Sequence, residues 1–488
     1  MKFEVFENGC KSTKFDLSGA YLFGADGIAI RKVDISFSDG QINCQKPHQE
    51  TAGLCLVWPI LGFGKVLLPT TVLPERESPY ILNVEIARAK LMQVMTKCED
   101  WGFFSAIEGL TEMSEEAKEL FIKAIQNLSE PAKASKFADE SLKRSILVSE
   151  KLTSQQANDL FSTRVESHSF GRACLGCVVE PDKVANKQYS ESLVSTFGYV
   201  TVPIKWCEIE PEPGKYDFSN LDNCIKILSK YRLAIGAGPL LCFSPDYLPK
   251  WLMGGRVDFE NILKYAYDFI SHVVERYNSL VRVWNVLRGM NFYNHFGFDF
   301  EQALEMTRAA TMAVKAVSGR SIKMIEVTNP WGEYYSDTAN TIPPLVYMDM
   351  IIQSGISFEV FGLEFQFGRN ISGMHIRDML QISAILDEFL PISKPIYITN
   401  AAIPSKGSSS GEGAGVWRGE WNEQLQCLWI EQFCKIALSK PFIDSVTYSG
   451  LIDSKKSFIP NSGLLTKDME PKQSFKVLNK LHKILLNR

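Results

Sequence analysis

Eight short apolar runs, each followed by an amphipathic segment, constrain the fold of this chain more than any other feature. The runs cover residues 173–179, 199–202, 233–241, 281–287, 322–327, 360–365, 395–399 and 443–448. Runs of this length that are rich in β-branched residues are typical of buried strands, and segments such as 259–274 and 300–317 have helical spacing. Eight strand–helix units predict an α/β fold, a (β/α)₈ TIM barrel, in which functional side chains lie where the strands end.

The first part of the chain has a different pattern of apolar residues and turn signals, which predicts a small β-sandwich-like module over residues 1–105. Residues 30–37, 54–58 and 81–86 are candidate strands, and Asp26-Gly27 and Asp39-Gly40 are turn signals. A structural role is the simpler interpretation of this module, and a carbohydrate-binding role is the alternative.

Residues 106–165 predict a helical connector, and the barrel is then expected over 166–488. One amphipathic helix should begin at Ser114 and end before Pro131. A second should start at about Ser135. A third should follow the capping box that Thr153 and Gln156 form.

Charge and cysteine content restrict the partners and the compartment. The formal net charge of -4 argues against nucleic acid and anionic membranes as partners, and no apolar run is long enough for a membrane span. The 11 cysteines are odd in number and scattered, and the first eight residues lack the apolar core of a signal peptide. These features predict a cytoplasmic protein with no metal and no cofactor. The lone pair Cys174 and Cys177 is expected to be two buried thiols.

The loop after the run at 199–202 reads K-W-x-x-I-E-P-E-P-G-K-Y-D-F over residues 205–218. This stretch resembles the segment after the second strand of glycoside hydrolase family 10, the endo-1,4-β-xylanases. Residues 283–286 resemble its fourth strand, residues 395–399 its seventh, and residues 463–465 and 471–472 its final loop and helix. The resemblance covers about residues 170–488. It implies a xylanase-like barrel that binds or cleaves a β-1,4-linked saccharide.

The resemblance also places two catalytic glutamates, and this chain has neither. Retaining enzymes of the family use an acid/base after strand four and a nucleophile after strand seven, with carboxyls about 5 Å apart. Gly289 and Asn400 occupy these positions. Loss of general acid catalysis typically costs about 10² to 10⁴ in rate, and loss of the nucleophile removes the covalent route. The sequence therefore predicts a catalytically degenerate member.

Other carboxylates near the predicted strand ends leave an alternative open. Glu326, Glu364, Glu333 and Asp453 are candidates for a relocated catalytic pair, which would make the protein an active O-glycosyl hydrolase. The competing interpretation is that Glu326 and Glu364 neutralise nearby cations such as Arg288, because buried charges need partners.

The expected partner is a saccharide bound where the strands end, and protein partners are not predicted. Candidate ligand-binding residues are Lys205, Trp206, Arg288, Gln366, Asn400, Trp417, Trp421 and Tyr448. The Gly/Ser-rich loop 405–421 is a candidate lid that carries two of these tryptophans, or else they anchor the loop. A free arginine near a lysine favours an acidic saccharide such as a uronate, because guanidinium binds carboxylate by paired hydrogen bonds.

Overall fold

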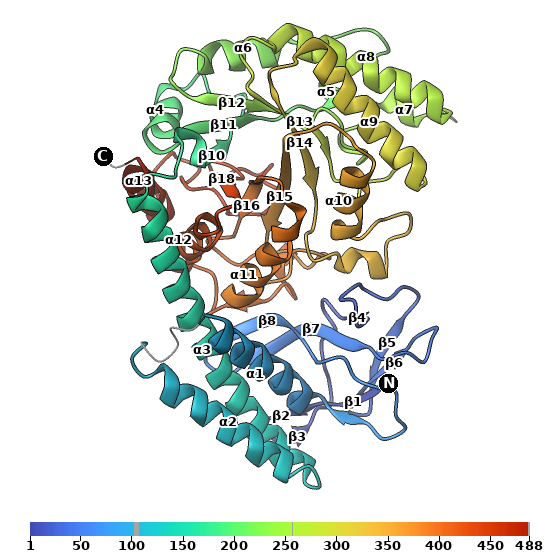
Figure 1. Ribbon diagram of the computed structural model, residues 1–488, viewed down its shortest axis with the longest axis vertical. Helices are drawn as coiled ribbons and strands as arrows, with labels where there is room; N and C mark the ends of the chain where they lie inside the picture. Colours follow the sequence, from blue (N-terminus) through green and yellow to red (C-terminus); the bar gives the residue numbers. More distant parts are fainter. Residues whose placement is uncertain (102–106, 256, 487–488) are drawn as a thin grey trace.

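A closed barrel of eight parallel strands surrounded by helices forms the larger part of the protein (Figure 1). The computed structural model describes residues 1–101, 107–255 and 257–486. The barrel strands, in order, are β10 (Leu175–Val178), β11 (Tyr199–Val202), β12 (Ala234–Ala237), β13 (Val283–Arg288), β14 (Ile322–Val327), β15 (Val360–Gln366), β16 (Ile396–Ala402) and β18 (Ile443–Tyr448). The predicted (β/α)₈ barrel is confirmed, and each predicted run overlaps one of these strands, although β13, β15 and β16 end one to three residues beyond their runs.

One main helix follows each strand. These helices are α4 (Lys187–Thr196), α6 (Ser219–Leu228), α8 (Phe259–Tyr277), α9 (Phe300–Val317), α10 (Pro344–Gln353), α11 (Met379–Glu388), α12 (Glu423–Ser439) and α13 (Gln473–Leu485). Shorter helices are α5 (Trp206–Ile209), α7 (Lys250–Met253), and the 3₁₀ turns η2 (Arg172–Cys174), η3 (Glu333–Ser336), η4 (Leu390–Ile392) and η5 (Ser409–Gly411).

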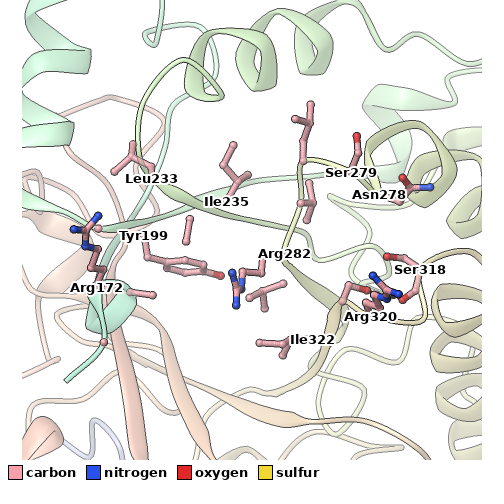
Figure 2. A pocket seen from close by; sticks show the side chains of 18 of the residues that line it. Arg172, Tyr199, Leu233, Ile235, Asn278, Ser279, Arg282, Ser318, Arg320 and Ile322 are labelled. Atoms are coloured by element: carbon pink, nitrogen blue, oxygen red, sulfur yellow. Dashed lines mark hydrogen bonds between the residues drawn. The ribbon is translucent and has the colours of Figure 1, made fainter. Parts of the chain in front are cut away.

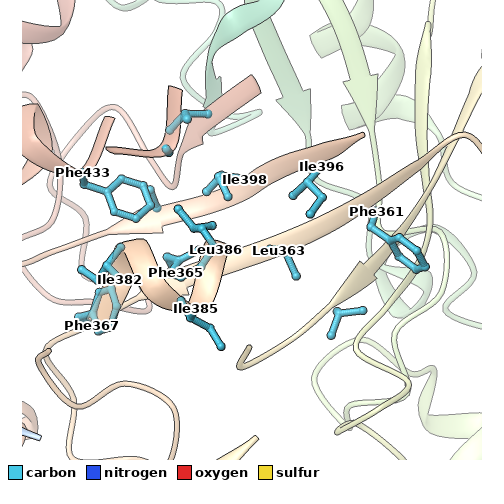
Figure 3. Close-up of a cluster of buried hydrophobic side chains, with 14 of the residues drawn as sticks. Phe361, Leu363, Phe365, Phe367, Ile382, Ile385, Leu386, Ile396, Ile398 and Phe433 are labelled. Atoms are coloured by element: carbon cyan, nitrogen blue, oxygen red, sulfur yellow. The ribbon is translucent and has the colours of Figure 1, made fainter. Parts of the chain in front are cut away.

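Strand alternation separates the core from the barrel interior. Side chains of successive strand residues point to opposite faces. On β15, Phe361, Leu363 and Phe365 point outward, and the Phe365 and Phe433 rings lie 5.5 Å apart between β15 and α12 (Figure 3). Glu364 and Gln366 alternate with these residues, so they point into the barrel, at the end where the strands terminate.

The amino-terminal module contributes one four-stranded sheet, three strands of a second sheet and a two-stranded ribbon, and β17 (Val416–Trp417) from the barrel completes the second sheet. Its strands are β1 (Lys2–Glu4), β2 (Phe6–Glu7), β3 (Cys10–Lys11), β4 (Tyr21–Phe23), β5 (Asp34–Ser38), β6 (Gln41–Gln45), β7 (Gly53–Ile60), β8 (Gly64–Pro69) and β9 (Tyr80–Ile81). The sheet orders are β5-β6-β1-β9 and β17-β8-β7-β4, with β2 paired to β3. The predicted β-rich module is therefore present.

The candidate strand over residues 81–86 is wrong, because helix α1 (Leu82–Trp101) begins there. Val84, Ala87, Leu91 and Val94 are buried at helical spacing, and they outweigh the local strand propensity. Asn83, at the start of this helix, hydrogen-bonds both the amide and the carbonyl of Phe6.

The connector contains two helices, α2 (Leu110–Gln126) and α3 (Pro131–Glu166), instead of the predicted three. Ser114 and Thr153 lie inside these helices and do not cap them, so both predicted helix starts are wrong. Pro131 occupies the first turn of α3, where a missing amide costs little. A stripe of buried apolar residues then continues along the helix, so α3 runs unbroken beside the module and the barrel (Figure 1).

Several contacts connect the module to the barrel. Strand β17 (Val416–Trp417) comes from the loop after β16 and pairs with β8 of the module. Lys90 of α1 forms a buried ion pair of 2.9 Å with Asp378 at the start of α11. The boundary near residue 105 falls in 102–106, outside the described residues. That boundary and the one near residue 165 stay predictions about folding units, which limited proteolysis of α2 and α3 tests.

Candidate functional site at the barrel mouth

We call the end of the barrel where the strands terminate the mouth. The segment that carries the family resemblance forms a hydrogen-bonded turn beside it. Glu210 accepts hydrogen bonds from Trp206 Nε1 at 2.7 Å and from the Gly214 amide at 2.8 Å. The Trp206 ring is 2% exposed and stacks on Phe269 at 5.0 Å. Trp206 is therefore a core residue, and its predicted contact with a ligand is wrong.

Lys205, directly before this tryptophan, remains partly exposed at the mouth. Its Nζ lies 3.4 Å from Glu208 and 5.7 Å from the centre of the Tyr247 ring. Glu208 raises the pKa of Lys205, against the effect of partial burial. Lys205 thus pairs with Glu208, and not with the glutamates inside the barrel.

A β-bulge aims Arg288 into the barrel. Strand β13 pairs with β14 through Asn285–Met324 and then Leu287–Ile325, so β13 has one extra residue. Regular alternation after Asn285 would point Arg288 outward to the helices. The extra residue reverses the alternation, which is a common use of bulges near functional sites.

Arg288 contacts two carboxylates on the next two strands. Its Nε lies 3.3 Å from Glu326 Oε1 on β14, and its Nη2 donates to Glu364 Oε2 on β15. Nη1 donates to the Tyr247 hydroxyl at 3.2 Å. The glutamate side chains are 1% and 2% exposed. Arg288 therefore lies between two buried acids and neutralises one charge of the two.

Burial determines which of these groups binds a proton near neutral pH. Burial raises the pKa of Glu326 to about 7, although Arg288 opposes the shift, and Glu364 adds to it. Burial alone would lower the pKa of Arg288, but Glu364 and Tyr247 raise it well above its ordinary value. Arg288 is therefore a fixed cation, and Glu326 is the titrating member of this group.

Four buried oxygens on β13, β14 and β15 accept no hydrogen bond from the part of the chain that the structure describes. Asn285 Oδ1, Glu326 Oε1, Glu364 Oε1 and Gln366 Oε1 are buried and accept no hydrogen bond within the described residues. Unpaired buried polar atoms are costly, at roughly 1 to 3 kcal/mol each. These atoms are buried, so they mark a costly polar interior and not a surface that a ligand contacts directly.

The position at which the resemblance places the acid/base has no room for a side chain. Gly289 has φ of 65°, a conformation that disfavours other residues. A Cβ there would lie 2.6 Å from Tyr293 Cδ2 and 2.7 Å from Thr328 Oγ1. Asn400, at the other position, pairs with Glu364 across β15 and β16 and is half-buried.

Glu333 and Asp453 lie in separate ion pairs. Glu333 binds Arg377 and the Gly373 amide, and Arg377 and His375 lower its pKa against the effect of burial. Asp453 lies 2.6 Å from Lys472 Nζ. The four candidate carboxylates therefore do not form one cluster. Only Glu326 and Glu364 of these four share a common contact within the described chain.

The remaining predicted aromatic contacts are buried. Trp417 is 0% exposed and donates to Glu150 of α3 at 3.3 Å, and Trp421 is 8% exposed. Of the two alternatives for these residues, anchoring of the loop agrees with their burial and the lid does not, since strand β17 fixes Trp417 against the module. Tyr448 is 4% exposed and its hydroxyl donates to the Ser462 carbonyl at 2.7 Å, so its ring does not face a ligand either.

Sequence reasoning missed three side chains at the mouth. Tyr247 and Tyr293 are partly exposed, and their rings lie 6.0 and 5.9 Å from the Arg288 guanidinium carbon. Glu180 follows β10 and accepts from the Tyr189 hydroxyl, and burial raises its pKa to about 7. Its position directly after the predicted strand over residues 173–179 was the available signal. The tyrosines lie in loops, where periodicity gives no signal.

Metal or thiol chemistry has no supporting cluster in the described ranges 1–101, 107–255 and 257–486. They hold no group of three or more His, Cys, Asp or Glu side chains arranged for a metal ion. Cys174 and Cys177 are buried, and their thiols have raised pKa values because of burial. No helix in these ranges has both the length and the apolar character to cross a membrane.

The barrel is similar to known xylanases. Residues 164–319 match the model of Glycosyl hydrolase family 10. Endo-1,4-beta-xylanase B of Thermotoga neapolitana is 21% identical over 278 residues, which are 56% of this chain and 75% of that protein. Among solved structures, native xylanase 10B from Thermotoga maritima has a TM-score of 0.51 at 16% identity, over 69% of this chain and 99% of that chain. A GH10 endoxylanase retrieved from a sugarcane soil metagenome has a TM-score of 0.50 at 15% identity, over 66% and 99%. This chain therefore contains a barrel like that of glycosyl hydrolase family 10.

Proposed function

We propose that the mouth of this barrel binds a saccharide without cleaving it by the family's retaining route. The observation that carries the proposal is Gly289. Its positive φ and the contacts with Tyr293 and Thr328 leave no space for the side chain of an acid/base. The carboxamide Asn400 at the second position cannot form a glycosyl ester.

The xylanase-like barrel supports a saccharide as the ligand class, and the mouth offers two kinds of contact for one. The partly exposed Lys205 Nζ donates hydrogen bonds to sugar hydroxyls. The partly exposed rings of Tyr247 and Tyr293 offer apolar faces for a pyranose.

The expected preference for an acidic saccharide loses its basis, because it required an Arg288 free to bind a carboxylate. Glu326 and Glu364 already neutralise the guanidinium. An additional carboxylate would meet two buried acids, and like charges repel strongly at low dielectric. The proposed ligand is therefore a neutral oligosaccharide, for which β-1,4-linked xylo-oligosaccharides are the first probe.

An active hydrolase remains the second candidate because of one observation. Glu326, with a pKa raised to about 7, has the character of a general acid, and Glu364 lies on the adjacent strand. Arg288 argues against this candidate, since it contacts both carboxylates and donates a hydrogen bond to Glu364. A nucleophile must be free to approach the anomeric carbon.

Calorimetry with xylohexaose tests the binding proposal. Replacement Tyr247→Ala should weaken binding about five-fold, because a stacked aromatic contact contributes roughly 1 kcal/mol. Tyr267→Ala on α8 is the matched control, because this tyrosine is 41% exposed and lies outside the mouth. Absence of binding by the unmodified protein, or equal weakening by both variants, would refute the proposal.

A further inference from the structure

A cavity of about 890 Å³ lies at the end of the barrel opposite the mouth (Figure 2). Its floor is made of residues at or near the amino-terminal starts of strands, among them Tyr199, Ile235, Val283, Ile322 and Tyr397. The volume is in the range of small-molecule sites, which lie between about 300 and 1,000 Å³. This cavity shares no lining residue with the mouth.

Four exposed arginines surround this cavity. Arg172, Arg232, Arg282 and Arg320 precede or begin the segments that lead into β10, β12, β13 and β14. Figure 2 shows Arg172, Arg282 and Arg320 spread across the cavity from one side to the other. Ser279 and Ser318 add hydroxyl groups, and the lining contains no acidic residue among those described.

These four arginines differ from the other arginines of the protein. None of the four forms an ion pair or a side-chain hydrogen bond with a described residue. By contrast, every other described arginine binds a carboxylate or a backbone carbonyl; these are Arg31, Arg76, Arg88, Arg144, Arg164, Arg276, Arg288, Arg308, Arg369, Arg377 and Arg418. The unpaired guanidinium groups are thus all collected at one cavity.

The acidic groups near this cavity do not neutralise it. The nearby acid Asp444 lies in β18. Burial raises the pKa of Tyr397, Asp444 adds to this shift, and Arg282 opposes it. Burial raises the pKa of Asp444, and Arg164 opposes this shift. Arg164 does not line the cavity. Glu359, beside the lining residue Ile322, is paired with Lys323. The four arginines therefore leave a positive potential over the cavity.

We propose that this cavity binds a small molecule that carries several phosphate groups. Guanidinium groups bind phosphate oxygens by paired, charge-assisted hydrogen bonds. The arginines come from four separate segments, and Figure 2 shows Arg172, Arg282 and Arg320 apart from one another, so a chain of phosphates reaches more of them than a single phosphate does. The apolar floor between them suits an organic group attached to the phosphates, as in a nucleoside triphosphate.

Calorimetry at about 0.15 M salt tests this site, because weak surface attraction is largely screened there. Inorganic tripolyphosphate should bind, and monophosphate should bind at least ten-fold more weakly. Arg282→Gln and Arg320→Gln should each reduce the tripolyphosphate affinity about ten-fold, as expected for loss of a charged hydrogen bond. The matched control is Arg308→Gln on α9, an exposed arginine outside the cavity, which should change nothing.

Further ligands in the same assay distinguish a nucleotide from other molecules that carry phosphate groups. Tighter binding of ATP than of tripolyphosphate would support a nucleotide that uses the apolar floor, and equal binding would support contacts to the phosphates alone. The proposal is overturned if tripolyphosphate does not bind, if monophosphate binds equally well, or if Arg308→Gln weakens binding as much as Arg282→Gln. Tighter binding of a short DNA duplex than of any of these small molecules would also overturn it. Xylohexaose binding at the mouth should be unchanged in all these variants.

Discussion

Arg288→Met removes the common partner of two buried acids and keeps most of the aliphatic stem. In the unmodified protein Arg288 is 13% exposed, and the contacting glutamates are 1% and 2% exposed. Removal of one partner from a buried ion pair typically costs about 3 to 5 kcal/mol, because the remaining charge is left uncompensated. The buried carboxyls can avoid this cost only if they bind protons.

The cost should therefore depend on pH. Protonating a carboxyl of ordinary pKa costs about 5 kcal/mol at about pH 8 and about 1 kcal/mol at about pH 5. The loss in free energy of unfolding should then be about 3 to 5 kcal/mol at about pH 8 and roughly 1 to 2 kcal/mol at about pH 5. The free energy of unfolding of the unmodified protein should also decrease as the pH rises, but by a smaller amount. The folded-state pKa of Glu326 is raised to about 7, so its stabilising protonation is complete below its unfolded value and is lost as the pH rises through 7.

Urea unfolding at the two pH values, followed by tryptophan fluorescence, measures the difference. Arg308→Met is the control, because its ion pair with Glu305 is exposed and such pairs contribute about 0 to 1 kcal/mol at either pH. A cost for Arg288→Met that is the same at both pH values, or that does not exceed the control, would refute the account of Arg288 as a bridge between two buried acids.

Three further predictions concern single positions. Lys90→Met should lower the free energy of unfolding by about 3 to 5 kcal/mol because Asp378 is left buried and unpaired, whereas the exposed control Lys118→Met should cost less than about 1 kcal/mol in the same urea assay. Trp206→Ala should cost about 3 to 5 kcal/mol in stability, and xylohexaose affinity measured on the folded fraction should stay the same. Gly289→Ala should lower the thermal unfolding midpoint by several degrees, because its φ is positive and the new methyl would contact Tyr293; an unchanged midpoint would show that the site has room.

The barrel was predictable because parallel strands are buried on both faces and appear in the sequence as apolar runs. Helix α9 was predicted over its full range for a similar reason, as its apolar stripe and its Asp299 cap are local signals. Helix α3 was divided wrongly because Ser and Thr residues that face other helices also look like caps. Ser141, for example, donates to the Ala117 carbonyl of α2.

Tertiary pairing decided the parts of the site that the sequence did not reveal. The direction of Arg288 depends on a one-residue shift between β13 and β14, and only the pairing of the two strands shows this shift. The burial of Trp417 depends on the pairing of β17 with β8, about 350 residues earlier in the chain. The arginines at the far end of the barrel are scattered along the sequence, and only closure of the barrel brings Arg172 and Arg320 to one cavity.

The most direct test of the central claim is a combined measurement on the mouth. Purified protein is incubated with xylohexaose, binding is measured by calorimetry, and products are followed by mass spectrometry. We expect saturable binding and no shorter oligosaccharides, in the unmodified protein and in Glu326→Gln alike. Release of shorter products that is abolished by Glu326→Gln or by Glu364→Gln would contradict the claim and identify an active hydrolase with relocated carboxylates.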